Sequence, residues 1–286
     1  SPVGTTEKIC QWIREVRPDL TVPTDSSQPD IHVAYCPERV LPGRVVYELI
    51  ANDRIVGGLT PACSEKAKAL YQTFVTGECL ISDARTAEMS KLTENAFRDV
   101  NIAFANELSL ICDELNINVW ELIKMANRHP RVNILTPGAG VGGHCIAVDP
   151  WFIVHSAPEQ AKLIRTAREV NDFKPQWVLQ KILSTVANHT LHKPSIACFG
   201  LAFKPDIDDL RESPALHIVN KLAAEYSGKV LAVEPNVHST NKLHANAELV
   251  SIEQGLAADI IVILVKHKAF NACDFKGKTV INVVGE

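Results

Sequence analysis

The sequence has 286 residues, of which 46% are hydrophobic and 22% are charged. A chain of this length and composition can form about two globular domains with sizeable cores. The net charge of −4, with lysines and arginines scattered along the chain, argues against a nucleic-acid partner. No apolar run approaches the roughly 20 residues of a membrane helix, and residues 1–6 do not resemble a signal peptide. We therefore expect a cytoplasmic protein with no membrane partner.

The first 82 residues alternate β-rich runs with helical patterns. An apolar stripe from Ile9 to Val16 predicts a capped first helix with no strand before it, so the sequence begins as if inside a domain. Strands are expected at 31–35, 54–58 and 78–81, and a helix at 62–74. This alternation indicates α/β layering.

The middle third is predicted to be helical. Residues 86–115 place apolar side chains along one broad face without a Gly or Pro, and residues 160–186 are again largely helical. Long helices of this kind often bury their apolar faces against a second copy of the chain. We expect a helical layer that forms a homodimer.

The last third returns to strands and helices. Apolar, non-alternating runs at 195–200, 229–233, 260–265 and 279–284 predict strands, with a helix at 216–224. Strands without alternation are typical of a parallel sheet that is covered on both faces.

The strongest functional signal is a cysteine that follows two glycines. Gly142 and Gly143 let the backbone pass close to a ligand, and Asp149 follows Cys145 by four residues. A thiolate attacks an aldehyde to give a thiohemiacetal, and loss of hydride leaves a thioester that water can hydrolyse. The alternative is a buried structural thiol, but the glycine pair and Asp149 favour catalysis.

Several other patterns are rejected as sites. The eight cysteines are widely spaced and form no CxxC pair, so we expect most to be buried and predict no metal. Residues 138–143 satisfy GxGxxG, but this stretch follows no strand and opens no helix, as a dinucleotide fingerprint requires. His144 and Cys145 are neighbours whose side chains diverge, so we do not interpret them as a dyad.

Lys91 and Asn95 share one face of the long predicted helix, four residues apart. A lysine beside an apolar stripe is costly, and an ammonium with an amide could hold a developing oxyanion. The alternative is a lysine whose stem covers the rim of the stripe. Arg98, one turn further, could reach the same ligand.

Charged residues also follow two predicted strands. Glu38 and Arg39 come directly after the strand at 31–35, where α/β folds bind ligands, so they are a candidate base and a candidate anion contact. Residues 200–206 combine Phe203 and Lys204 in a loop that suits a nucleotide base and diphosphate. Arg131 adds positive charge before the glycine loop. Exposed, solvated charges are the alternative in each case.

Four motifs together resemble the UDP-glucose/GDP-mannose dehydrogenase family. Their order and spacing are specific, and the resemblance covers essentially the whole chain. The motifs are Cys36-Pro37-Glu38-Arg39-Val40, Lys91-Leu92-Thr93-Glu94-Asn95, residues 140–152 (GVGGHCIAVDPWF), and Phe199-Gly200-Leu201-Ala202-Phe203-Lys204 with Arg211-Glu212-Ser213-Pro214. The GGHC form of the third motif is similar to the N-acetylhexosamine branch.

The resemblance implies two NAD-dependent oxidations at C6 of a UDP-N-acetylhexosamine, yielding a uronic acid for bacterial surface polysaccharide. The N-acetylmannosamine sugar is expected first, with N-acetylglucosamine or another UDP-sugar as alternative. Implied catalytic roles are nucleophile for Cys145, acid/base or oxyanion partner for Lys91 with Asn95, assistance to water or thiol for Asp149, and base for Glu38.

The resemblance also implies binding residues and domains. Substrate contacts are expected from Arg39, Val40, Arg98, His129, Arg131, Gly142, Phe203 and Lys204, with Arg131 reaching a neighbouring subunit, and NAD contacts from Thr6 and Arg211. The implied domains are the C-terminal part of an NAD-binding Rossmann-like domain at 1–82, a central helical dimerisation domain at 83–190, and a Rossmann-like UDP-binding domain at 191–286.

The sequence departs from the family in one large respect. Family members begin with a GxGxxG Rossmann unit of about a hundred residues, and no such unit occurs here. We therefore expect the chain to keep its catalytic residues without the main NAD site and to be a poor dehydrogenase alone. A non-catalytic, dimerising UDP-binding module is the rival interpretation.

Overall fold

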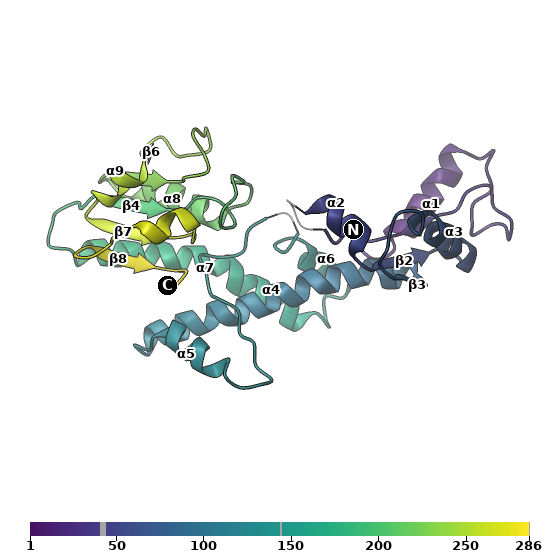
Figure 1. The fold of residues 1–286 in the computed structure, drawn as a ribbon, viewed down its shortest axis with the longest axis horizontal. Helices are drawn as coiled ribbons and strands as arrows, with labels where there is room; N and C mark the ends of the chain where they lie inside the picture. Colours follow the sequence, from purple (N-terminus) through teal and green to yellow (C-terminus); the bar gives the residue numbers. More distant parts are fainter. Residues whose placement is uncertain (41–43, 144, 286) are drawn as a thin grey trace. The chain divides into compact units, whose positions relative to one another are not determined.

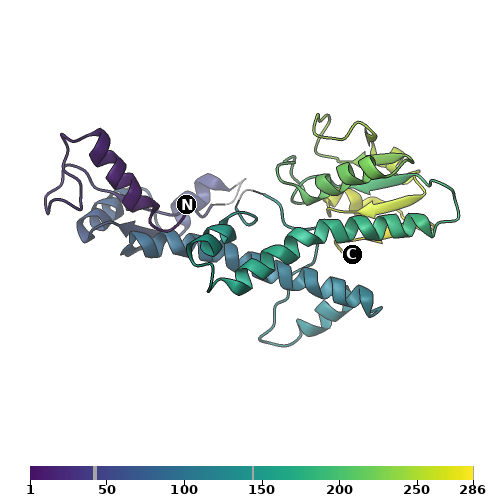
Figure 2. The same ribbon diagram turned by 180° about the vertical axis from the view of Figure 1, so that it is seen from behind.

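A computed structural model of the chain describes residues 1–40, 44–143 and 145–285. The chain forms two compact units, which we treat separately: unit 1 comprises residues 1–96 and 149–161, and unit 2 comprises residues 97–148 and 162–286. Figures 1 and 2 show the ribbon from opposite sides. No helix within the described residues is long and apolar enough to span a bilayer.

Unit 1 is a small α/β layer around a three-stranded sheet. The strand order is β1-β2-β3, and β2 pairs antiparallel with β1 and parallel with β3. The Thr60 hydroxyl caps α3 by accepting from the Cys63 N–H, and Pro61 follows at the first helical position. The elements are α1 (Thr5–Val16), β1 (Ala34–Tyr35), α2 (Val45–Ala51), β2 (Arg54–Gly58), α3 (Pro61–Tyr71), β3 (Cys79–Asp83), the start of α4 (Ala84–Glu114) and α6 (Asp149–Ser156).

Unit 2 is built on a five-stranded, wholly parallel sheet. Its order is β6-β5-β4-β7-β8, so the first strand in the sequence, β4, lies at the centre between β5 and β7. This order is that of a Rossmann-like fold. Its elements are the rest of α4, α5 (Val119–Ala126), α7 (Lys162–Ala187), β4 (Ile196–Phe199), α8 (Pro214–Glu225), β5 (Val230–Val233), β6 (Ala247–Val250), α9 (Ile252–Leu256), β7 (Ile260–Ile263), the 3₁₀ helix η1 (Lys268–Ala272) and β8 (Thr279–Asn282).

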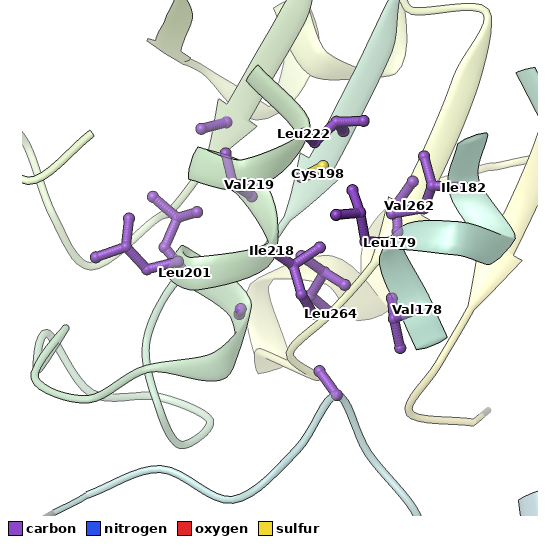
Figure 3. Close-up of a cluster of buried hydrophobic side chains, with 14 of the residues drawn as sticks. Val178, Leu179, Ile182, Cys198, Leu201, Ile218, Val219, Leu222, Val262 and Leu264 are labelled. Carbon is purple, nitrogen blue, oxygen red and sulfur yellow. The ribbon is translucent and has the colours of Figure 1, made fainter. Parts of the chain in front are cut away.

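Both faces of this sheet are covered. On one face, Val178 and Ile182 of α7 and Ile218 of α8 pack against the strands in a fully buried cluster (Figure 3). On the other, Phe199 packs against Phe270 of η1 and the partly buried Leu256 of α9. Every residue of β4, β5 and β7 is buried. The prediction of a parallel sheet with two covered faces is therefore confirmed.

The long helices agree with the sequence patterns, and the short elements agree less well. The helix expected at 86–115 is α4, and the one expected at 160–186 is α7. The strand expected at 31–35 is reduced to two residues, and α2, α5, α6, α9 and β6 were not predicted. Elements of four to eight residues carry too few positions to show a period. The domain boundaries near 82 and 190 remain a prediction.

A buried polar network joins α4 to α7 within unit 2. The Arg168 Nη1 atom lies 2.7 Å from Asp99 Oδ1, and Asn171 Nδ2 donates to the same oxygen at 2.8 Å. Asn106 Nδ2 donates to Asn171 Oδ1 at 2.9 Å, and its own Oδ1 accepts from the Gly138 N–H at 2.9 Å. The network therefore fixes both helices and the start of the glycine loop.

Lys174 is a second buried charge on α7. Its ammonium lies 4.1 Å from the Trp177 ring centroid and donates to the Ser109 hydroxyl. Burial, with the nearby Lys181 charge, lowers the pKa of Lys174 from an ordinary 10.5 to about 8. The folded state therefore holds this proton less tightly than the unfolded state.

We predict that Lys174→Met removes a pH dependence from stability. Between pH 8 and 10.5 the unfolded chain binds the extra proton, so the wild-type free energy of unfolding rises with pH in that window. Relative to the variant, the wild type should gain about 2 kcal/mol from pH 7 to 9.5 in urea unfolding. Lys66→Met, at an exposed position of α3, controls for the loss of one lysine. A pH-independent difference would contradict the prediction.

Candidate active site

The structure brings two expected catalytic residues together in unit 1. Asn95 projects from α4 and is buried, and its Nδ2 donates to Asp149 Oδ2 at 2.6 Å. Asp149 is the first residue of α6 and is followed by Pro150, which the first helical turn tolerates. Lys91 lies one turn before Asn95 and is half-buried. An amide thus orients a carboxylate beside the helix face that carries the lysine.

A buried carboxylate that the sequence did not predict anchors α1. Glu88 Oε1 accepts from the Thr6 N–H at 2.7 Å and from the Thr6 hydroxyl at 2.6 Å, and Oε2 accepts from the Gly4 N–H at 2.6 Å. The hydroxyl of Thr6, a residue expected near NAD, therefore donates its hydrogen bond to Glu88. The signal was present: Glu88, like Lys91, is a charge on the buried face of α4.

Glu38 is held as an acceptor by its own loop. Its Oε1 accepts from the N–H groups of Arg39 and Val40 at 2.6 and 2.9 Å, and its Oε2 lies 3.6 Å from Nη1 of the buried Arg54. Arg39, an expected substrate contact, pairs with Glu94 of α4 at 2.9 Å. The expected base is thus positioned by Arg54, a residue that sequence reasoning assigned only to a strand.

Tyr35 is a further titratable group that sequence reasoning missed. Burial raises the pKa of its phenol, and the charges of Glu88 and Asp149 raise it further. The phenol therefore stays protonated at neutral pH, and the Asp149 carboxylate is close enough for its charge to act on it.

In unit 2 the glycine loop packs on the loop after β4. A Cβ at Gly142 would lie 2.5 Å from the Glu212 carbonyl oxygen and 3.0 Å from Phe203 Cβ. Gly143 has a φ of +87°, and a Cβ there would lie 3.1 Å from the Phe203 ring. Larger residues do not fit, so the two glycines let the loop lie against Phe203.

Cys145 is exposed at the end of this loop. A turn closed by the Val148 N–H and the Cys145 carbonyl oxygen, 3.1 Å apart, leads on to Asp149. All eight cysteines are free, five are buried and two are half-buried, so Cys145 alone presents an exposed thiol. His144 lies outside the described residues.

A cavity of about 410 Å³ lies between the glycine loop and the loops after β4 and β7, all within unit 2. Its walls include Gly142 and Phe203 and three cationic side chains, Arg98, Lys204 and Lys266. A wall with one aromatic ring and several cations suits an aromatic base linked to phosphate groups.

The remaining predicted site residues lie on exposed segments. His129 and Arg131 are both exposed after α5, where the Arg131 N–H donates to His129 Nδ1 at 3.3 Å. Arg211 is exposed and forms a bidentate pair with Asp209. Of the expected catalytic residues, Glu38, Lys91, Asn95 and Asp149 belong to unit 1, and Cys145 belongs to unit 2.

Comparison with known proteins identifies the family. Three domain profiles of the UDP-glucose/GDP-mannose dehydrogenase family match: the NAD binding domain at residues 1–75, the central domain at 85–173 and the UDP binding domain at 197–283. The chain therefore belongs to this family, as its motifs predicted, and NAD is the family's cofactor.

Individual relatives agree with this placement. The chain is 60% identical to UDP-N-acetyl-D-mannosamine dehydrogenase from Escherichia coli K12, over 94% of this chain and 66% of that protein. It is also 60% identical to NDP-N-acetyl-D-galactosaminuronic acid dehydrogenase from Ralstonia nicotianae, over 96% of this chain and 65% of that protein. The chain thus spans just under two thirds of the length of these relatives. A UDP-D-ManNAc dehydrogenase structure from Pyrococcus horikoshii superposes with a TM-score of 0.85 at 36% identity, covering 99% of this chain and 70% of that one.

Two stretches of the described residues that could bind the pyrophosphate of NAD do not fit it. Gly138–Gly143, which satisfies GxGxxG, lies in a loop with no strand before it, so its rejection as a fingerprint is confirmed. At the start of α1, the N–H groups of Gly4 and Thr6 are taken by Glu88. The profile match at 1–75 shows a counterpart of the NAD binding domain, while the expectation that the main NAD site is missing stays a prediction.

We predict that iodoacetamide alkylates Cys145 at least about 10-fold faster than any other thiol, because it alone is exposed. Burial raises the pKa of Cys36 and of Cys273, and raises that of Cys198 to about 12, so these react slowly. Peptide mapping by mass spectrometry measures the rates, and Cys145→Ser should lack the fast phase. Equal rates at Cys145 and Cys273 would show that the loop does not present its thiol.

Proposed function

We propose that the protein to which this sequence belongs is an NAD-dependent dehydrogenase that oxidises C6 of UDP-N-acetyl-D-mannosamine to the uronic acid. The single observation that carries the proposal is the exposed Cys145 thiol at the end of a loop packed on Phe203. Family membership and the 60% identity to a UDP-N-acetyl-D-mannosamine dehydrogenase support it. The product suits the synthesis of bacterial surface polysaccharide.

Cys145 accounts for the passage from aldehyde to acid. Its thiolate adds to the C6 aldehyde, and the carbonyl oxygen becomes the alkoxide of a thiohemiacetal. Loss of a hydride from C6 restores the carbonyl as a thioester. Water then attacks this carbonyl, the C–S bond breaks, and the carboxylate and the free thiol are released. NAD supplies the hydride acceptor for the alcohol and thiohemiacetal oxidations.

We assign proton transfer and oxyanion stabilisation to residues of unit 1. Lys91 is the acid/base or oxyanion partner together with Asn95. Asp149, oriented by the Asn95 amide, assists water or the thiol, and Glu38 is the base in thioester hydrolysis. Donors from the protein fix the orientation of each carboxylate, which supports a role that needs a defined position.

We assign the UDP moiety to the cavity in unit 2. Phe203 suits the base, while Arg98 and Lys204 suit the diphosphate. Arg39, Val40, His129, Arg131 and Gly142 remain proposed substrate contacts, with Arg131 reaching a neighbouring subunit; Thr6 and Arg211 remain proposed NAD contacts. The eight free thiols support a reducing compartment, so we place the protein in the cytoplasm.

Overall sequence identity does not decide which sugar is the substrate, so the choice needs an activity assay. Relatives named for N-acetylmannosamine and for N-acetylgalactosaminuronic acid are equally identical to this chain, at 60%. The epimers differ at C2 or C4 and are distinguished by individual contacts to the sugar hydroxyls.

We predict that this chain, joined to an N-terminal dinucleotide-binding domain, forms NADH fastest with UDP-N-acetylmannosamine. The panel should include UDP-N-acetylglucosamine, UDP-N-acetylgalactosamine and UDP-glucose. Cys145→Ser should lower acid formation by more than about 10³-fold, because the thioester cannot form.

Cys273→Ser, at a half-buried position away from the glycine loop, should leave the rate unchanged and is the matched control. Acid formation by the Cys145→Ser protein at the wild-type rate would refute the thioester route. Steady NADH production by the 286-residue chain alone would overturn the expectation that its main NAD site is missing.

We also propose a homodimer through the central helices. Phe97, Phe104 and Ile111 of α4 are spaced by seven residues and so share one helix face, and they are 69%, 53% and 47% exposed. An apolar stripe with this spacing is typical of a helix that packs on another helix.

We predict that Phe104→Glu shifts the protein from dimer to monomer in sedimentation velocity experiments, because it places a charge in the centre of this stripe. Leu70→Glu, at a similarly exposed position on α3, is the control and should leave the dimer intact. A wild-type monomer at micromolar concentration would contradict the proposal.

A further inference from the structure

Glu234 is a fully buried carboxylate that none of the proposed catalytic steps uses. It follows the last residue of β5, and its side chain is 0% exposed. Its Oε2 accepts from the N–H groups of Leu201 and Ala202 at 2.8 and 3.0 Å. Its Oε1 accepts from the Asn236 N–H at 3.1 Å. The carboxylate is thus satisfied by backbone donors of two loops.

His267 completes the arrangement from the loop after β7. Its side chain is also 0% exposed, and its Nε2 lies 3.0 Å from Glu234 Oε2. Its Nδ1 accepts from the Asp206 N–H at 2.9 Å. Because a backbone N–H can only donate, Nδ1 carries no proton, and the neutral ring donates its Nε2 proton to Glu234.

The two side chains therefore hold both ends of one loop. Glu234 binds the loop after β4 at Leu201 and Ala202, and His267 binds it at Asp206. Burial raises the pKa of Glu234, but the hydrogen bonds from His267, Leu201 and Asn236 outweigh burial and lower it overall. The charged form that these donors require is thus the stable form at neutral pH.

Glu234, at the end of β5, differs in its role from the equivalent acid of a dinucleotide-binding fold. In a dinucleotide-binding Rossmann fold, the amides after the first strand bind the pyrophosphate, and an acid at the end of the second strand binds the ribose. Here β4 and β5 occupy those places, but the acid binds the amides. The Glu234 carboxylate occupies the position that a ligand phosphate takes in such a fold. The Leu201 and Ala202 N–H groups already donate to it and are not available to a phosphate.

The loop held in this way carries the residues that face the cavity. Phe203 and Lys204 lie between the two fixed ends and line the cavity, and Phe203 packs on Gly142 and Gly143. Gly200 sets the start of the loop: its φ is +91°, and a Cβ there would lie 2.4 Å from Val265 Cβ.

We propose that Glu234 and His267 are positioning residues that convert the phosphate-binding loop of a Rossmann fold into a rigid platform presenting Phe203 and Lys204 to a nucleoside diphosphate. This inference rests on the proposed UDP site in the cavity. The pair acts on ligand affinity through the loop and has no part in the chemistry at Cys145.

The test measures UDP affinity by calorimetry and loop protection by hydrogen exchange, using the 286-residue chain. Glu234→Gln replaces one accepting oxygen with a donor that opposes the loop amides. It should weaken UDP binding at least tenfold and speed exchange at Leu201 and Ala202 at least tenfold. The alkylation rate of Cys145 should change less than twofold.

A second pair of variants separates positioning from general loss of structure. His267→Gln keeps a donor and an acceptor and should lose less than threefold in UDP affinity. His267→Phe keeps a ring against Phe270 but neither polar atom, and should lose at least tenfold, with faster exchange at Asp206. Glu248→Gln, an exposed carboxylate on β6 of the same sheet, should behave as wild type.

The outcomes distinguish the two proposals. Wild-type UDP affinity and wild-type exchange in Glu234→Gln and His267→Phe would overturn the positioning role. If the wild-type chain shows no UDP binding while both variants expose the loop amides, the UDP site fails and the loop anchor stands. If Glu234→Gln does not fold, the contrast between His267→Gln and His267→Phe decides, and equal affinities there overturn the proposal.

Discussion

The buried ion pair between Asp99 and Arg168 is the interaction on which the arrangement of unit 2 depends. The side chains are 0% and 2% exposed, and the residues lie 69 positions apart in the sequence. Two charges in such a place are tolerated only when they are paired, and removing one partner of a buried pair typically costs about 3–5 kcal/mol. The pair therefore fixes α4 against α7, and Asn171 and Asn106 extend that constraint to Gly138. The buried network thus fixes the position of Gly138, where the loop that ends in Cys145 begins.

Three carboxylates of the protein bind backbone N–H groups of the kind that can bind an anionic ligand. Glu88 binds the first amides of α1, Glu38 binds the amides of its own loop, and Glu234 binds the amides after β4. An N–H group without a partner in a buried place is costly, so Glu88 and Glu234 stabilise segments whose amides would otherwise need water or an anion. Glu38 orders an exposed loop in the same way. The segments fixed in this way carry Thr6, Arg39 and Phe203, three residues proposed to contact cofactor or substrate.

The sequence predicted those parts of the structure that depend on local pattern. The spacing of apolar residues predicted α4 and the apolar strands of unit 2. The four-residue spacing of Lys91 and Asn95 predicted that they share a helix face. The pairing of Asn95 with Asp149 could not be predicted in this way, because it joins residues 54 positions apart. The family resemblance implied a catalytic role for each residue but not their contact. Glu234 and His267 were missed for a related reason. Each looks like an ordinary polar residue in sequence, and its importance comes from burial and from backbone partners in distant loops.

The division of the chain between the two units has a consequence for biosynthesis. Residues 149–161 belong to unit 1, although most of that unit is complete by residue 96. On the ribosome, where about 5–20 residues are added each second, Asn95 waits roughly 3–10 s for the carboxylate of Asp149 to be synthesised. During that interval the chain between them can form only the first part of unit 2. The segment that bears Cys145 is therefore synthesised just before residues 149–161, and unit 1 is completed only after that exposed thiol has been made.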